Sequence, residues 1–371
     1  MSYCIALTRP GRLLGLVAIG MALAASSAYA DPHEHGSDGD WLVFLTGEAR
    51  VRSNADIAPG EDYDFASADV LYSHSSGPFR VLGEVFAASP EVDIERLQVG
   101  WEFGENRLLW VGRFHQPASA WNTQHHHGQF LQTAITRPNI ERWEDEGGVI
   151  PQHISGALLE SRGALGDRAG LSVSVGGGAA PVIAGGEMVP IGPFHINPGG
   201  YRPSWTARIG LLPESVGEDT VGIVLARHDV NIRDPAIVTL LHADDALLDV
   251  SGAFAQLSPS GWHVQAAYYD VQVALSTGPQ VRHEHFGAGY AQLEHVLPHA
   301  LTAFGRIETT AGAGNVSYVT YQRQEFTLRR GLGGLRWDFA RRQALTIEAG
   351  RSATLLGHSS EVRLQWSGVL P

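Results

Sequence analysis

Residues 41–52 read WLVFLTGEARVR, and the alternation within this stretch decides the fold. One set of alternate positions is apolar or small: Trp41, Val43, Leu45, Gly47, Ala49 and Val51. The intervening positions become polar, with Thr46, Glu48, Arg50 and Arg52. Successive side chains of a strand point to opposite faces, so the stretch predicts a strand that separates an apolar environment from an aqueous one.

The same alternation recurs along the chain. The apolar series are Phe79, Val81, Gly83 and Val85, then Leu97, Val99, Trp101 and Phe103, then Leu335, Trp337 and Phe339, then Val362, Leu364 and Trp366. The opposite faces carry charge, with Arg80, Glu84, Arg96, Glu102, Arg336, Asp338, Glu361 and Arg363. Aromatic residues gather at strand ends: Trp41, Phe79, Trp101, Trp110, Trp262, Trp337 and Trp366. This combination favours strands that cross a lipid bilayer over a soluble sandwich, which alternates equally well.

The breaks between about sixteen such strands alternate in length. Tight breaks fall at 76–78, 104–106, 163–168, 213–219, 258–261, 297–300 and 340–343. Long breaks fall at 54–62, 116–150, 179–202, 230–246, 272–282 and 310–322. Short periplasmic turns and longer extracellular loops are typical of an antiparallel up-and-down outer-membrane β-barrel, so residues 41–371 are predicted to form one, with 14–18 strands. Phe326 and Leu328 are out of phase with Leu335, which predicts a β-bulge at 331–334.

The N-terminus predicts export. Arg9 and Arg12 precede an apolar run, and the Ala28-Tyr29-Ala30 motif fits a cleavage site, so residues 1–30 are expected to be a signal peptide. Residues 31–40 then form a short His/Asp-rich tail. Removal of two arginines takes the net charge of −13 to −15, which argues against nucleic acid as a partner. The only cysteine, Cys4, lies in the signal peptide, so the mature chain has no disulfides.

Residues 116–150 form the longest connection and the third on the long-loop side. The segment contains Trp121, Phe130, Leu131, Ile135, Ile140 and Trp143 together with many charged residues. A connection this apolar must pack against something. We therefore expect it to fold into the lumen as a constriction or plug-like loop.

Several motifs here resemble a family of uncharacterised porin-like outer-membrane proteins of Gram-negative bacteria. They are Gly112-Arg113-Phe114-His115, Trp121-Asn122, the histidines 125–127, Arg137-Pro138, Glu144-Asp145-Glu146 and Pro151-x-His153. The likeness covers about an eighth of the chain. The same stretch is more distantly similar to general and phosphate-selective porins. It implies a barrel and a pore but no particular solute. The chain ends five residues after Trp366, whereas many such barrels end on an aromatic residue recognised during assembly.

Charged residues are the candidate pore lining. Inward-facing arginines from both ends of the chain could form one basic wall opposite acidic residues of the long loop, including Glu141. The alternative is that these arginines pair with Glu48, Glu84, Glu348 and Glu361. The expected lining residues are Arg50, Arg52, Arg80, Arg96, Arg113, Arg137, Arg142, Glu144, Asp145, Glu146, Arg336 and Arg363.

Histidines are the candidate metal ligands. Alternate residues of extended chain share a side, so zinc or copper could be bound weakly by His125 and His127 with His153, and His115 or Glu144 could assist. The alternative is packing and hydrogen bonding within the loop. His283 and His285 share one strand face and are expected to line the lumen.

The expected function is a porin-like channel for passive diffusion of small hydrophilic solutes or ions, in the outer membrane of a Gram-negative bacterium. Its partners would be outer-membrane lipid, the barrel assembly machinery and two further copies in a homotrimer. A non-conducting barrel with a ligand-binding, metal-binding, structural or sensory role is the alternative. Neither a G-x-S-x-G nor an H-E-x-x-H motif is present, so we expect no enzymatic activity.

Overall fold

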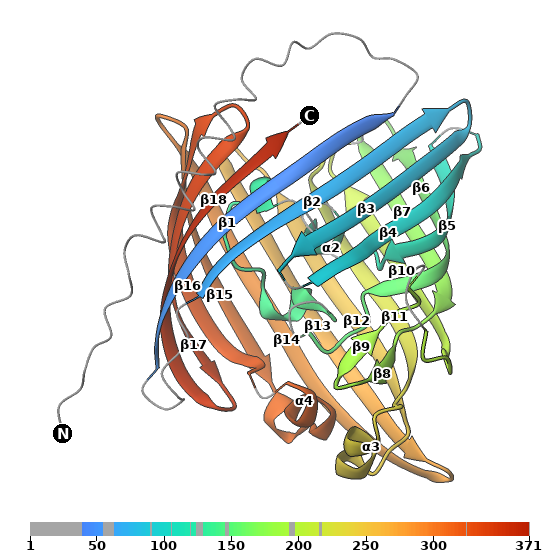
Figure 1. The fold of residues 1–371 in the computed structure, drawn as a ribbon. Helices are drawn as coiled ribbons and strands as arrows, with labels where there is room; N and C mark the ends of the chain where they lie inside the picture. Colours follow the sequence, from blue (N-terminus) through green and yellow to red (C-terminus); the bar gives the residue numbers. More distant parts are fainter. Residues whose placement is uncertain are drawn as a thin grey trace, which may run out of the picture.

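The computed structural model describes residues 39–54, 63–89, 91–104, 106–118, 120–123, 129–144, 148–192, 197–214, 217–323 and 325–370. Within these ranges the chain forms one closed barrel of sixteen antiparallel strands (Figure 1). The predicted fold class is confirmed, and the strand number is the expected one. The predicted signal peptide and nearly all of the N-terminal tail lie outside the described residues.

The barrel strands follow one another around the wall in chain order. They are β1 (Asp40–Asn54), β2 (Tyr63–Ser76), β3 (Phe79–Ala88), β4 (Glu91–Glu102), β5 (Arg107–His115), β6 (His153–Leu165), β7 (Ala169–Ala179), β10 (Pro203–Leu212), β11 (Thr220–Asn231), β12 (Asp245–Leu257), β13 (Trp262–Thr277), β14 (Gln280–Leu297), β15 (Leu301–Ala311), β16 (Thr327–Ala340), β17 (Gln343–Thr354) and β18 (Gly357–Leu370). The ring closes between β1 and β18, where Val43 pairs with Leu370 and Asn54 with Ser359.

Long and short connections are divided between the two rims. We call the rim at Asp40 and Leu370 the turn rim, and the opposite rim, where residues 116–150 depart, the loop rim. The loop rim is less uniform than predicted. Thr277 pairs with Gln280, so the expected long break at 272–282 is wrong: β13 and β14 continue through it to a tight turn. The β17–β18 connection on this rim is equally tight, because Thr354 pairs with Gly357.

Helices and one small hairpin lie in the loop-rim connections. They are α2 (Ala120–Thr123), η1 (Gln129–Leu131), η2 (Asn139–Arg142), the hairpin β8 (Val182–Ala184) and β9 (Glu187–Val189), α3 (Pro235–Leu241), η4 (Ala313–Asn315) and α4 (Ser317–Gln322). Figure 1 shows α3 and α4 at the loop rim and α2 within the barrel. In the described part of the chain, no helix has the length and apolar character that crossing a membrane demands.

The outer face of the barrel is the apolar face predicted from the sequence. Trp41, Val99, Trp101, Val111 and Ile307 are exposed on it. Thr46, Glu48 and Gln98, at intervening positions, are buried inside. Trp110 departs from the expected girdle. Its neighbours Leu109 and Val111 are exposed, whereas its indole Nε1 lies 2.9 Å from Glu160 and donates a hydrogen bond to it.

The two faces of β11–β14 exchange character near the loop rim. On β13 the outward series passes from Tyr268 to polar Asp270 and Gln272, while inward-facing Val271 and Val273 are fully buried. The same change occurs on the neighbouring strands, where outward Arg227 of β11 pairs with Asp249 of β12 at 3.3 Å. These strand ends therefore have the pattern of a soluble sheet: water outside and an apolar core within.

The apolar core at the loop rim corrects two expectations from the sequence. Phe326 and Leu328 are out of phase because they pack inward, against the apolar core at the loop rim. No bulge is needed at 331–334, and the β16–β17 register shifts instead lie at Thr327/Arg329 and Trp337/Ala340. His285, expected in the lumen, alternates with fully buried Phe286 and faces outward, where it contacts Asp270.

Candidate functional site in the barrel lumen

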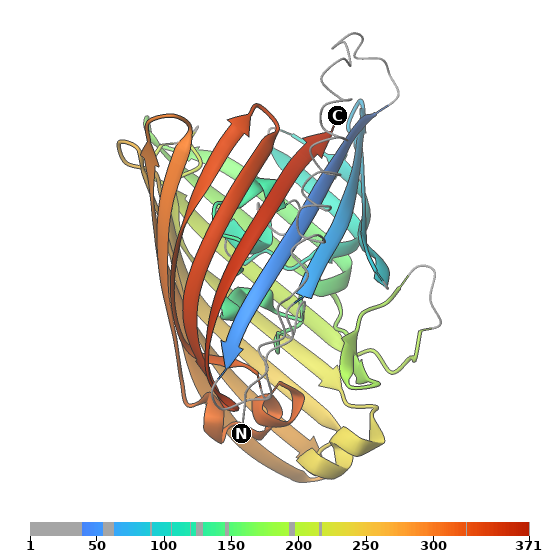
Figure 2. The same cartoon turned by 60° about the vertical axis from the view of Figure 1, so that its left-hand side comes forward.

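The segment 116–150, which we call the lumenal segment, folds into the barrel. It leaves β5 after His115 and returns to β6 before His153, two residues that pair directly with each other. The Gln116 N–H donates to the Gln152 carbonyl at 2.8 Å and closes the base of the loop. Figure 2 shows the segment behind the strands of the near wall. The inward path expected from its composition is confirmed.

Apolar side chains fix one side of the segment. Trp143 is fully buried and meets Tyr269 of β13 edge to face, with ring centroids 5.8 Å apart. Trp121 and Ile140 are also buried, and all three belong to one cluster with inward residues of β11–β14. Burial of these three residues stabilises the segment by roughly 5–9 kcal/mol, at roughly 1.5–3 kcal/mol for each large side chain.

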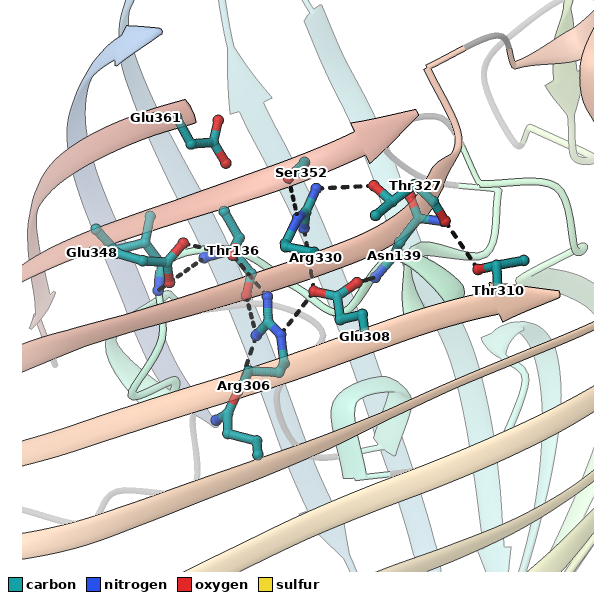
Figure 3. A network of polar contacts seen from close by, with 12 residues as sticks. Thr136, Asn139, Arg306, Glu308, Thr310, Thr327, Arg330, Glu348, Ser352 and Glu361 are labelled. Atoms are coloured by element: carbon teal, nitrogen blue, oxygen red, sulfur yellow. Dashed lines mark hydrogen bonds and ion pairs between the residues drawn. The ribbon is translucent and has the colours of Figure 1, made fainter. Parts of the chain in front are cut away.

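Hydrogen bonds to charged wall residues fix the other side (Figure 3). Glu348 of β17 accepts from the backbone N–H of Ile135 at 3.0 Å and from the Thr136 hydroxyl at 2.6 Å. Arg306 of β15 donates to the carbonyl and hydroxyl oxygens of Thr136, both at 2.7 Å. Glu308 accepts from the Asn139 N–H at 2.8 Å. Hydrogen bonds with a charged partner are each worth about 1.5–3 kcal/mol, so this wall holds the segment firmly.

Further contacts extend the attachment around the wall. Arg336 of β16 donates to the Gln132 carbonyl and lies 5.0 Å from the Phe130 ring centroid. The Thr133 hydroxyl donates to Glu294 of β14 at 2.7 Å. On the other side of the lumen, Arg208 of β10 donates to the Ala118 carbonyl at 2.9 Å. The segment thus spans the interior from β10 to β17.

Inward-facing arginines are matched with carboxylates. Arg363 lies 2.8 Å from Glu48 and 3.1 Å from Glu361, and Arg96 contacts Glu84. Arg113 pairs with Asp93 at 3.0 Å and Arg336 with Asp338 at 2.7 Å. Arg80 contacts Glu102, and Arg52 lies 3.9 Å from Glu325. The charge of these arginines is therefore balanced largely within the wall, and Glu48, Glu84 and Glu361 are among the partners named from the sequence.

The acidic residues of the lumenal segment that the structure describes, Glu141 and Glu144, make their hydrogen bonds away from this arginine wall. Glu141 is fully buried and accepts a hydrogen bond from the Tyr269 hydroxyl at 2.9 Å. Glu144 turns back to the base of the loop, where it accepts from the Gln152 N–H at 2.8 Å and contacts His153. Arg137 is buried and Arg142 half-buried within the segment. Asp145 and Glu146 lie outside the described residues.

Three potential metal ligands meet at the base of the lumenal segment. Glu95 of β4, His115 of β5 and His153 of β6 place one ligand atom each within 4.8 Å of one another, and all three residues are buried. His153 was a predicted ligand and His115 a predicted helper, whereas Glu95 was not considered. His125 and His127 lie outside the described residues.

Of the wall residues that hold the segment, Arg336 and Glu348 were assigned to the lumen from sequence, whereas Arg306 and Glu308 were not named. Arg306 and Glu308 flank outward-facing Ile307, so alternation alone assigns both to the lumen. That assignment could not show which backbone groups they would contact. Tyr269 and the inward apolar residues were missed because the expected pattern placed only polar residues inside.

A cavity of about 250 Å³ lies between the lumenal segment and the turn-rim ends of β12–β14. Its lining is predominantly polar and includes Gln132, Thr133, Gln265, Gln292 and Glu294. The volume is sufficient for several water molecules or a small solute.

Comparisons with known proteins agree on the fold. No protein-family model and no curated protein sequence matches the chain. Among solved structures, Salmonella typhi OmpF in complex with daunomycin superposes with a TM-score of 0.57 at 10% identity, covering 90% of this chain and 98% of that chain. The outer-membrane channel DcaP of Acinetobacter baumannii gives 0.54 at 13% identity, with coverage of 92% and 99%. OmpT, an outer-membrane protein of Vibrio cholerae, gives 0.55 at 8%, with coverage of 89% and 97%. The chain has the porin-like barrel fold.

Proposed function

We propose that this protein is an outer-membrane channel for passive diffusion of small hydrophilic solutes or ions, and that the lumenal segment constricts it. One observation carries the proposal: the segment crosses the interior and is tied to charged wall residues at Thr136 and Asn139 and to Arg208 at Ala118. A segment held this way narrows the lumen without needing to move. Charged groups then surround the remaining path, as in ion-conducting pores.

The outer face supports a membrane location. Its exposed surface is apolar, and Trp41, Phe79, Trp101, Trp262 and Trp337 lie near the turn rim, where aromatic girdles form at a membrane interface. We place the turn rim in the periplasm and the loop rim outside a Gram-negative cell. Delivery there requires the predicted signal peptide and the barrel assembly machinery.

The proposed lining comprises the predicted arginines of the wall together with residues of the segment. Arg50, Arg52, Arg96, Arg113 and Arg363 come from strands β1, β4, β5 and β18, and Arg137, Arg142 and Glu144 from the lumenal segment. Arg80 and Arg336 lie nearer the turn rim. Because most of these arginines have acidic partners, we expect weak ion selectivity.

Single-channel recording in planar bilayers tests the channel. Purified full-length protein should give discrete conductance steps. Replacing residues 121–143 by a short Gly-Ser linker should raise the unit conductance and lower selectivity, provided that the variant retains the folded barrel's electrophoretic mobility. Absence of steps from folded wild-type protein at all voltages overturns the channel. Unchanged conductance in the folded deletion variant overturns the constriction.

A non-conducting barrel is the second candidate, and the packing at the loop rim favours it. Inward residues of β11–β14 form one apolar cluster with Trp143 of the lumenal segment, Ile237 and Leu241 of α3, and Val319 of α4. A filled mouth of this kind suits a structural or ligand-binding role. A silent but correctly folded barrel in the bilayer experiment supports this candidate. We assign no catalytic activity to either form.

Self-association is part of the proposal. One structure of Vibrio cholerae OmpT, superposing with a TM-score of 0.51, is described as a trimer form. For this chain we propose a homotrimer with lipid around it. Mass measurement of the detergent-solubilised protein tests this, and a monomer at all concentrations contradicts it.

A further inference from the structure

We propose that Glu95, His115 and His153 form a binding site for a divalent transition-metal ion, zinc by preference, at the base of the lumenal segment. The ligand atoms are a carboxylate oxygen and two imidazole nitrogens. Such a mixed N/O set is typical of zinc and related borderline cations, and unlike the all-oxygen sites of calcium or magnesium.

The strand register brings the two histidines together. His115 and His153 are direct partners at the loop-rim ends of β5 and β6, so both side chains lie on the inner face. Their ring centroids are 4.9 Å apart, with an interplanar angle of 70°. Each ring turns its Nε2 atom toward Glu95 Oε2, at 4.0 Å for His115 and 2.9 Å for His153. Two ligands of a tetrahedral zinc ion lie about 3.4 Å apart, so small side-chain shifts complete the geometry.

A β-bulge brings the carboxylate into the cluster. Glu84 of β3 pairs with Arg96, and the next residue, Val85, pairs with Ile94, which leaves Glu95 as the extra residue in β4. In a regular strand Glu95 and Arg96 would point to opposite faces. The bulge allows Arg96 to contact Glu84 inside the barrel while Glu95 also points inward. Bulges commonly re-aim a side chain in this way beside functional sites.

Glu144 supplies the outer support that metal-bound histidines usually have. It contacts His153 Nδ1 and is itself held by the backbone N–H groups of Gln152, at 2.8 Å, and His153, at 3.1 Å. A carboxylate on Nδ1 fixes the tautomer in which Nδ1 carries the proton, and this leaves Nε2 as the metal ligand. Nε2 is the atom that faces Glu95. Metal binding then replaces any proton on Nε2 and releases it to solvent.

The bound ion would join three strands at the point where the lumenal segment begins and ends. His115 immediately precedes the segment, and His153 follows it. The nearby Arg113 guanidinium opposes a cation, but Asp93 partly offsets its charge at 3.0 Å. The inference does not depend on conduction, because binding is measured directly on the folded protein.

Zinc and cobalt(II) binding to full-length, metal-stripped protein without a polyhistidine tag tests the site. We expect one ion per chain, and a visible cobalt absorption spectrum characteristic of low coordination number. Glu95→Gln and His115→Gln should each weaken binding at least tenfold and change the cobalt spectrum. Glu144→Gln should weaken it about 10–100-fold, as loss of an outer-shell partner does.

Three control variants separate this site from other histidines. His285→Gln removes an exposed histidine that contacts Asp270 on the outer face, and should leave affinity and spectrum unchanged. Replacement of residues 125–127 by glutamine, and of His33 and His35 by glutamine, should also leave them unchanged. Absence of binding to folded wild-type protein overturns the site. So does equal binding by wild type, Glu95→Gln and His115→Gln, with folding checked by electrophoretic mobility.

Discussion

Thr136 of the lumenal segment makes two hydrogen bonds to one carboxylate of the wall, that of Glu348 on β17. Its hydroxyl lies 2.6 Å from Oε1 and its backbone nitrogen 3.3 Å from Oε2. The same threonine accepts two hydrogen bonds from Arg306 of β15. Thr136 thus links the segment to an acidic side chain of β17 and to a basic side chain of β15.

Thr136→Val keeps the shape of the side chain and removes the hydroxyl. We expect the local free energy of opening to fall by about 1.5–3 kcal/mol, because buried charged groups lose a partner. Hydrogen exchange of residues 129–144 measures this. Thr239→Val removes a hydroxyl on α3 that donates only to the Pro235 carbonyl, and should leave exchange in the segment unchanged. Equal protection in Thr136→Val and wild type would mean that the hydroxyl does not anchor the segment.

Arg306→Met should be strongly destabilising. The guanidinium is fully buried and pairs with Glu308 at 2.9 Å, so its loss leaves a buried carboxylate undercompensated, although Arg330 remains 3.4 Å away. Breaking such a pair costs about 3–5 kcal/mol. Urea unfolding in detergent measures the change, and the double variant with Glu308→Gln should recover part of it. The exposed Arg227–Asp249 pair is the control, worth at most about 1 kcal/mol.

Arg363→Gln should shift ion selectivity toward cations. The change removes a positive charge from a lumenal group and leaves Glu48 and Glu361 without that counter-ion. We expect the K⁺/Cl⁻ permeability ratio to rise at least about twofold, measured as a reversal potential in a KCl gradient. Arg227→Gln, on the outer face, is the matched control. A conducting variant with unchanged reversal potential would remove Arg363 from the pore lining.

Single cysteines can locate the membrane boundary on β13, since the only native cysteine, Cys4, precedes the predicted cleavage site. A spin label at Tyr268→Cys should be accessible to oxygen and shielded from a water-soluble nickel reagent. A label at Gln272→Cys, four residues further along the same outer face of β13, should show the reverse. Identical accessibility at both positions would place the boundary elsewhere.

Much of the fold could be predicted because its signal is local. The alternation from Trp41 to Val51 arises because one face of a single strand meets an apolar environment and the other meets water. A tight turn such as 76–78 is likewise specified by a few neighbouring residues. The inward path of residues 116–150 was predicted for the same reason, since Trp121 and Trp143 had to be buried.

Three features could not be predicted from local sequence: the direction of side chains at the loop rim, the bulge at Glu95 and the contacts between remote residues. Leu328 and His285 could not be assigned correctly, because the sequence alone did not show that the loop-rim ends of β11–β14 and the start of β16 enclose an apolar core. The cluster at Glu95 depends on a bulge, and a bulge changes side-chain direction without a distinctive residue type. Pairings such as Arg306 with Thr136 join residues remote in sequence and follow from the closed shape.

The seam between β1 and β18 has a consequence for how the barrel forms. Every other ladder joins neighbours around the wall that are also successive barrel strands in the chain, whereas this one joins Val43 to Leu370. The entropy lost on closing a loop grows with the logarithm of its length, so this ladder is the most costly to start from an open chain. It becomes favourable once the intervening hairpins have already curved the sheet and brought its edges together. We therefore expect closure of the seam to be the final, rate-limiting step of folding, and an unclosed sheet with two exposed edges to be the species most prone to aggregation.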